Sequence, residues 1–116
     1  MRLKEFETRY NLHDSFIESL NYDEVTATLT LVIDFAFWMQ KDFKEGDEEN
    51  GLIEVVFHNV KEHECDNGDP AGDFVSILGA KADENSLIIS LIDDECNDYM
   101  ELKVIAESVE VKKVNA

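Results

Sequence analysis

The chain has 116 residues and carries 27 acidic and 10 basic side chains, which gives a net charge of −17. This length is typical of one domain, and a hydrophobic fraction of 44% supports one core, which excludes a disordered protein. No apolar run reaches the roughly 18 residues of a membrane helix, and the charged start 1–5 does not resemble a secretory signal. We therefore expect a single cytosolic domain, 1–116.

The acidic residues are concentrated in the middle of the chain. Segments 1–22 and 99–116 are nearly balanced, whereas 23–98 contains 20 acidic and 4 basic residues. Such a field repels nucleic-acid phosphates and anionic membranes, so we expect neither as a partner. It attracts basic proteins or divalent cations, although solubility alone also explains the composition.

The first elements are a short helix and a strand. Leu3, Phe6 and Tyr10 lie on one face of a helix, although an extended segment also fits them. Residues 16–22 predict the first strand, with a hairpin turn at 21–24.

The strongest pattern is the alternation over 25–39, where every odd position is apolar. Successive side chains of a strand point to opposite faces, so this period of two predicts one long amphipathic strand. The threonines on its other face favour the same conformation.

Further strands are expected at 52–64, 74–82, 86–92 and 100–111. The last changes phase, which predicts a β-bulge near 107–108. The acidic segments 41–51 and 66–73 are expected to be loops, and Asn50-Gly51 offers a turn with positive φ. The six strands predict a mainly β, single-domain antiparallel meander, either a sandwich or a strongly curved open sheet.

The string Leu12-His13-Asp14-Ser15 is the first candidate site. Its three polar residues suggest a catalytic triad, but neighbouring residues of an extended segment point apart, and a triad requires convergence in space. A turn closed by Asp14 or Ser15 explains the string without any chemistry. If the string is functional, His13 and Asp14 form a metal-ligand pair or a polar contact site.

His58, His63 and Cys65 are the second candidate, as zinc ligands. On a straight strand His63 and Cys65 share a face and His58 points away, so a bulge is required, together with a fourth ligand such as Asp66 or Cys96. The alternative, which we favour, is that His58 and His63 are ordinary polar residues on a solvated face and Cys65 is a small apolar filler. In a reducing compartment the two cysteines are expected to be free thiols. The acidic segment 66–70 does not match a calcium-binding loop, because glycine and proline stand where ligands are needed.

The third candidate is an aromatic group beside the first acidic loop. Trp38 clusters with three phenylalanines, Phe35, Phe37 and Phe43. The loop brings the carboxylates of Asp47, Glu48 and Glu49. Aromatic anchors next to charges are typical of a protein-binding surface. Alternatively Phe35 and Phe37 fill the core and Trp38 covers an edge.

Four segments carry a family resemblance: 12–15, 33–34, 53–60 and 102–111. They resemble, in order, the Leu-His-Asp-Ser string, an Ile-Asp strand end, an Ile-x-Val-x-Phe-x-Asn-Val strand and a Leu-x-Val-x-Ala-x-x-Val-x-Val strand of a group of small, uncharacterised bacterial proteins. Some members are thought to be immunity proteins of contact-dependent or polymorphic toxin systems. The resemblance implies neutralisation of a toxin by binding, without catalysis, and it assigns no active-site residue.

We therefore expect a binding protein rather than an enzyme, with a basic protein such as a toxin as partner and no cofactor. The alternatives are a metal-binding module or metal-dependent enzyme that uses the histidines above, and a homo-oligomeric subunit whose edge strands pair.

Overall fold

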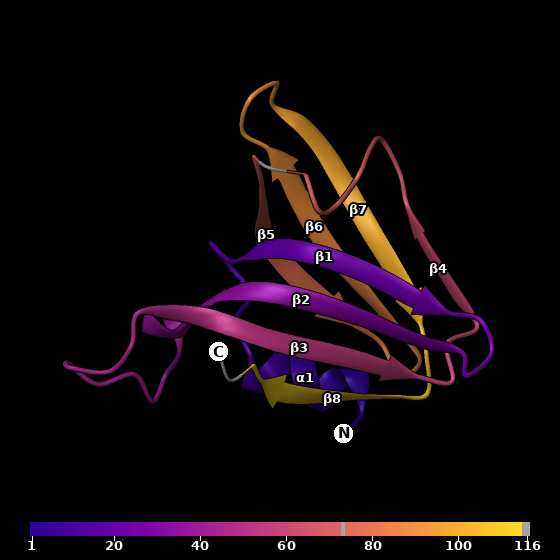
Figure 1. Ribbon diagram of the computed structural model, residues 1–116, viewed down its shortest axis with the longest axis horizontal. Coiled ribbons are helices and arrows are strands. Elements are labelled where there is room, and N and C mark those ends of the chain that lie inside the picture. The colour runs from indigo at the N-terminus through magenta and orange to yellow at the C-terminus, as the bar shows by residue number, and fades with distance from the viewer. Residues whose placement is uncertain (73, 115–116) are drawn as a thin grey trace.

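The computed structural model describes residues 1–72 and 74–114. This part of the chain forms eight strands in two four-stranded antiparallel sheets, together with helix α1 (Leu3–Arg9) and the 3-10 turn η1 (Phe37–Met39) (Figure 1). The mainly β antiparallel fold and the short N-terminal helix are confirmed. The expected number of six strands is wrong, because two predicted strands each divide into two.

The first sheet has the order β1-β2-β3-β8 and the second β4-β7-β6-β5. The strands of the first sheet are β1 (Phe16–Asp23), β2 (Thr28–Ala36), β3 (Asn50–His58) and β8 (Ser108–Lys113). Those of the second are β4 (Glu62–Cys65), β5 (Val75–Ala82), β6 (Ser86–Asp93) and β7 (Asp98–Ile105). In Figure 1 the strands of the first sheet run across those of the second.

The chain passes between the sheets twice, at one corner of the molecule. The predicted strand 52–64 ends at His58, turns at Asn59 with φ 53°, and resumes as β4 in the other sheet. The phase change near 107–108 is the return passage from β7 to β8, so the predicted bulge is wrong. The two passages are joined where Glu107 N donates to His58 O at 3.2 Å and Lys61 N donates to Ile105 O at 2.8 Å.

The central strand β2 confirms the alternation but not its length. Leu29, Leu31, Ile33 and Phe35 are buried, as predicted, whereas the strand covers only Thr28–Ala36. Val25 is 95% exposed in the β1–β2 turn. Apolar residues continue to occupy the odd positions in this turn and in η1, where the backbone is no longer a strand. The alternation alone therefore predicted too long a strand.

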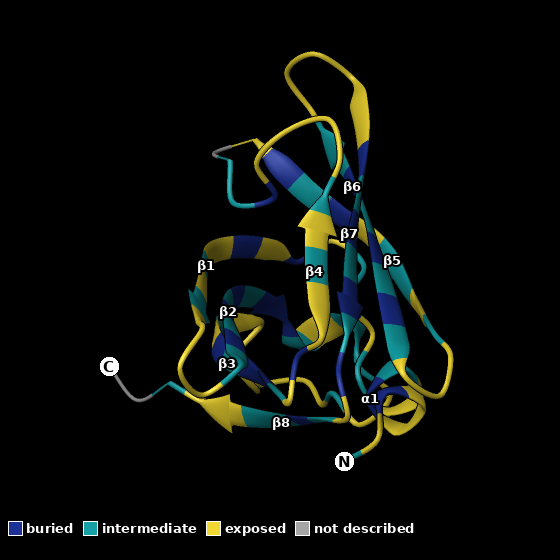
Figure 2. Cartoon of the chain, turned by 90° about the vertical axis from the view of Figure 1, so that its right-hand side faces the viewer, coloured by how far each residue is buried: buried dark blue, intermediate teal, exposed yellow. Residues whose placement is uncertain are grey.

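The core is shared by both sheets and by α1. One buried cluster joins inward residues of β2 and β3 to those of β6 and β7, and the strands in Figure 2 show alternating buried and exposed bands. Helix α1 adds Leu3 and Phe6, and the Phe6 ring contacts Phe57 edge-on with centroids 6.4 Å apart. Burial of each such side chain contributes about 1.5–3 kcal/mol.

Two outer edges are covered by the N-terminal segment. Asp14 N donates to Ile77 O at 3.0 Å and Ile77 N donates to Ser15 O at 2.8 Å, so β5 is paired at this point on its outer side. Met1 and Val109 exchange two hydrogen bonds on the outer side of β8. Covered edges do not offer free backbone groups to another chain.

The predicted loop 66–73 follows β4 and lies against the core. Pro70 is buried, and Gly68 has φ +147°, with Met100 Sδ only 3.1 Å from where a Cβ would stand. Asp73 of this loop lies outside the described residues. No helix in the described part of the chain has the length and apolar character needed to cross a membrane.

Gly51 has a different role from the one expected. It belongs to β3, opposite Phe35, and its φ is not positive, so the predicted Asn50-Gly51 turn is wrong. A Cβ on Gly51 would lie 2.7 Å from Cε2 of Phe37. The missing side chain therefore makes room for the Phe37 ring.

We predict that Gly51→Ala displaces this ring and lowers the free energy of unfolding by about 1–3 kcal/mol, because an added methyl overpacks the contact. Urea denaturation measures the effect. The matched control is Gly79→Ala in β5, where a Cβ meets nothing within 4 Å. Equal stability of the two variants would contradict the proposed role of Gly51.

Candidate functional site

The Leu12–Ser15 string is a structural junction. Leu12 and Ser15 are buried, and Ser15 Oγ accepts a hydrogen bond of 3.0 Å from Ala36 N at the end of β2. The Ser15 carbonyl accepts from Ile77 N in β5. Ser15 thus connects the first sheet to the second, and its hydroxyl faces the interior instead of a substrate.

His13 and Asp14 lie on the surface of the same junction. His13 Nδ1 donates to Leu78 O at 2.8 Å, and its Nε2 is 3.5 Å from Asp14 Oδ1. Asp14 has φ 64°, a left-handed turn conformation that aspartate tolerates. Both side chains are about half exposed, and they are paired with each other and the backbone.

We predict that Ser15→Ala lowers the free energy of unfolding by about 1–3 kcal/mol, because the buried Ala36 amide loses its acceptor. Thermal and urea denaturation provide the measurement. Ser19→Ala, on the exposed face of β1, is the control and should change stability much less. A Ser15→Ala protein as stable as the control would show that the junction does not depend on this hydrogen bond.

The second candidate group is not brought together. His58 lies in β3 of the first sheet, whereas His63 and Cys65 lie in β4 of the second. The His63 ring packs against Tyr22, with centroids 4.5 Å apart, and His58 Nε2 donates to Glu110 Oε1 at 2.8 Å. In residues 1–72 and 74–114 no three His, Cys, Asp or Glu side chains are arranged to hold a metal ion.

Both cysteines are free thiols. Burial, together with the nearby carboxylate of Asp66, raises the pKa of Cys65. A hydrogen bond to the Asp98 carboxylate raises the pKa of Cys96. Raised values keep both groups protonated, and the thiol is a weaker nucleophile and metal ligand than the thiolate.

The His58–Glu110 pair gives a pH prediction. The hydrogen bond from His58 is the main reason that the pKa of Glu110 is lowered, with Lys112 as a smaller cause. A lowered carboxyl pKa contributes stability above the unfolded-state value, and this contribution is lost as the pH falls through the folded-state value.

We therefore expect His58→Val to raise the Glu110 pKa toward its ordinary value, and Lys112→Gln to raise it less. Carboxyl NMR titration measures both. An unchanged Glu110 titration in His58→Val would contradict the assignment of the cause.

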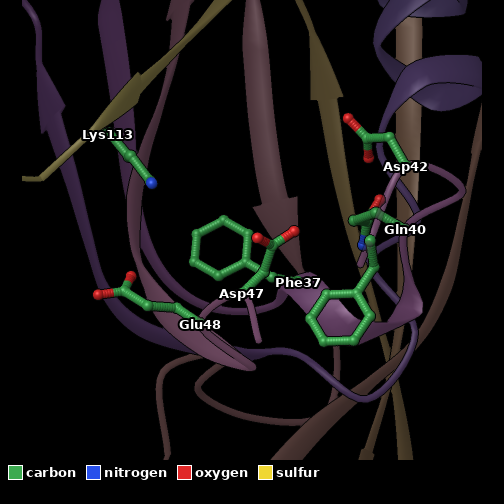
Figure 3. Close-up of a pocket in the computed structure, with 7 residues that line it drawn as sticks. Phe37, Gln40, Asp42, Asp47, Glu48 and Lys113 are labelled. Carbon is green, nitrogen blue, oxygen red and sulfur yellow. The ribbon is translucent and has the colours of Figure 1, made fainter. Parts of the chain in front are cut away.

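The third candidate region forms a cleft of about 400 Å³ at one end of the first sheet (Figure 3). We call it the Phe37 cleft. It is lined by one ring from η1, residues of the loop after η1, and the last residue of β8: Phe37, Gln40, Asp42, Phe43, Asp47, Glu48 and Lys113.

The aromatic floor of the cleft is positioned by packing. The Phe37 ring contacts Phe35 edge-on, with centroids 5.3 Å apart, and lies over Gly51. Phe35 is buried in the core, so Phe37 continues the core outward to the surface. Its ring is half-buried, with the rest open to a ligand.

Gln40 fixes the start of the loop to the body. Its Nε2 donates to Asn11 O at 2.8 Å and to Ala36 O at 2.9 Å, while its Oε1 accepts from Asn11 N at 2.9 Å. The side-chain amide therefore uses both donors and its acceptor on backbone groups. It holds the loop beside the N-terminal segment and leaves no group free for catalysis.

The carboxylates come from the turn at 44–47. Asp47 N donates to Lys44 O at 3.0 Å, and Asp47 Oδ2 accepts from Lys44 N at 3.1 Å. Gly46 has φ +99°, which this tight turn requires. Asp47 is thus held by its own turn, and Glu48 follows it into the lining.

The structure includes part of the predicted aromatic and acidic group in the cleft. Asp47 and Glu48 line it, whereas Trp38 and Glu49 do not; they support it through a hydrogen bond of 3.2 Å from Trp38 N to Glu49 O. Trp38 is 44% exposed and lies in η1, not on a strand face. The predicted aromatic group contributes Phe37 and Phe43 to the lining, whereas Gln40, Asp42 and Lys113 were not among the predicted site residues.

The cleft suits the binding of a cation. It has three carboxylates, two phenylalanine rings and one lysine. An exposed ring face next to carboxylates is an arrangement that can hold a cation by cation–π and ionic contacts.

Comparisons of the chain with protein-family models, with curated proteins and with solved structures gave no match. The function is therefore argued from the residues and the geometry above.

Proposed function

We propose that this protein is a non-enzymatic binding module that captures a basic protein through the Phe37 cleft and the acidic surface around it. The observation that carries the proposal is the meeting of an open aromatic ring with Asp42, Asp47 and Glu48 in one cleft. Charge steers a basic partner toward this surface, and the ring gives it a place to bind.

The net charge supports a basic partner over a second copy of the chain. Two molecules of charge −17 repel each other, whereas a protein with a basic surface is attracted to this one. The edges of β5 and β8 are also partly covered by the N-terminal segment, which disfavours pairing of the sheets with another copy.

The family resemblance agrees with this role. An immunity-like protein would neutralise a toxin by binding to it, and such a partner is basic if it is complementary to this surface.

We also propose that the two sheets are the layers of a β-sandwich. The core that they share supports this arrangement and gives the cleft a rigid base.

The single tryptophan makes the proposal measurable, because Trp38 directly follows Phe37. We predict that a synthetic peptide of alternating glycine and arginine changes the Trp38 fluorescence and binds more weakly as salt rises, since salt screens exposed charges. Asp42→Asn with Glu48→Gln should weaken binding about two- to thirty-fold, by the loss of two exposed ion pairs.

The control is Glu24→Gln with Glu95→Gln, which removes the same charge from the exposed turns 24–27 and 94–97. It should weaken binding much less. Equal weakening by the two double variants would show that the peptide responds to the overall negative charge of the protein and not to the Phe37 cleft. The absence of any peptide binding at low salt would reject the proposed function.

A further inference from the structure

Lys113 already places a positive charge in the Phe37 cleft. Its Nζ lies 5.2 Å from the centroid of the Phe37 ring, within the distance of a cation–π interaction. Figure 3 shows the ammonium directed into the cleft, on the same side as Glu48.

The register of the sheet explains this position. Lys113 is opposite the buried Ile53, so it has the parity of an inward residue at the end of β8. An ammonium group is not stable in an apolar core without a partner. The core ends here at Phe37, and the lysine lies over the ring with its charge in water.

The adjacent lysine behaves differently. Lys112 points to the other face of β8, where its Nζ is 3.7 Å from Glu110 Oε1. Lys113, in contrast, makes no ion pair in the described part of the chain. It is held by the ring and the surrounding field, not by a fixed carboxylate.

We infer that Lys113 is an internal substitute for an arginine of the partner, and that the partner displaces it from the Phe37 ring. This inference rests on the proposed function and names the group that the cleft accepts. A guanidinium stacks flat on an aromatic ring and forms paired hydrogen bonds with carboxylates. Asp42, Asp47 and Glu48 line the same cleft as the ring on which it would stack.

Displacement makes the site selective. A weakly bound cation, such as a sodium ion or an isolated amine, gains little by replacing a lysine that is attached to the protein. An arginine on a basic surface brings the ring contact together with further ion pairs, so it competes successfully. Lys113 therefore reduces the affinity of the cleft for every cation. Only a partner that makes several contacts then binds appreciably.

The experiment compares Lys113→Gln with Lys112→Gln in the full chain, using the glycine–arginine peptide. Both variants lose one positive charge, but only the first removes the competing cation. Lys113→Gln should tighten binding about two- to five-fold, the range that corresponds to an exposed cation–π contact. Lys112→Gln should produce no comparable change, and Lys113→Arg should not tighten binding.

Side-chain NMR tests the displacement directly. The ε-methylene signal of Lys113 should be shifted by the ring current of Phe37, and this shift should disappear in Phe37→Leu and on saturation with peptide. A shift that persists at saturation, or equal effects of Lys113→Gln and Lys112→Gln, would overturn the inference.

These results are distinguishable from a failure of the proposed function. If Asp42→Asn with Glu48→Gln weakens binding but the two lysine variants behave alike, only the role of Lys113 is rejected. If no variant and no wild-type protein binds the peptide, both proposals are rejected together.

Discussion

The sharing of one buried apolar cluster by both sheets is the constraint on which this structure depends. Leu31 in β2 and Ile89 in β6 come from different sheets and belong to the same buried cluster. Neither sheet has another element large enough to cover its inner face, since α1 has only seven residues. The two passages of the chain between the sheets follow from this need, because they place strands of both sheets around one core.

The alternation of apolar residues predicted the β class and the inward residues of β2. The spacing of Leu3, Phe6 and Tyr10 predicted the short N-terminal helix. The alternation did not predict the passages between sheets, because Asn59 turns the chain by its backbone conformation while the apolar pattern continues on both sides. For the same reason the pattern did not show where β2 ends at Ala36. Periodicity reports which side chains are buried, but it does not report to which sheet a strand belongs.

Only part of the Phe37 cleft could be predicted from the sequence, for a related reason. Asp47 and Glu48 are visible in the sequence as part of an acidic loop, whereas Lys113 reaches them only because β8 pairs with β3 after the chain has crossed twice. The role of Gly51 was also hidden, since it depends on the closeness of Phe37. Sites built from residues distant in sequence require the pairing of strands, which local patterns do not specify.

The position of β8 has a consequence for synthesis of the protein. Strands β1, β2 and β3 leave the ribosome first, but the outer side of β3 has no partner until β8, which begins 50 residues after β3 ends (His58 to Ser108). In the nascent chain this side of β3 exposes unpaired backbone groups. The intervening segment is acidic, and like charges oppose the close approach of two such unfinished chains.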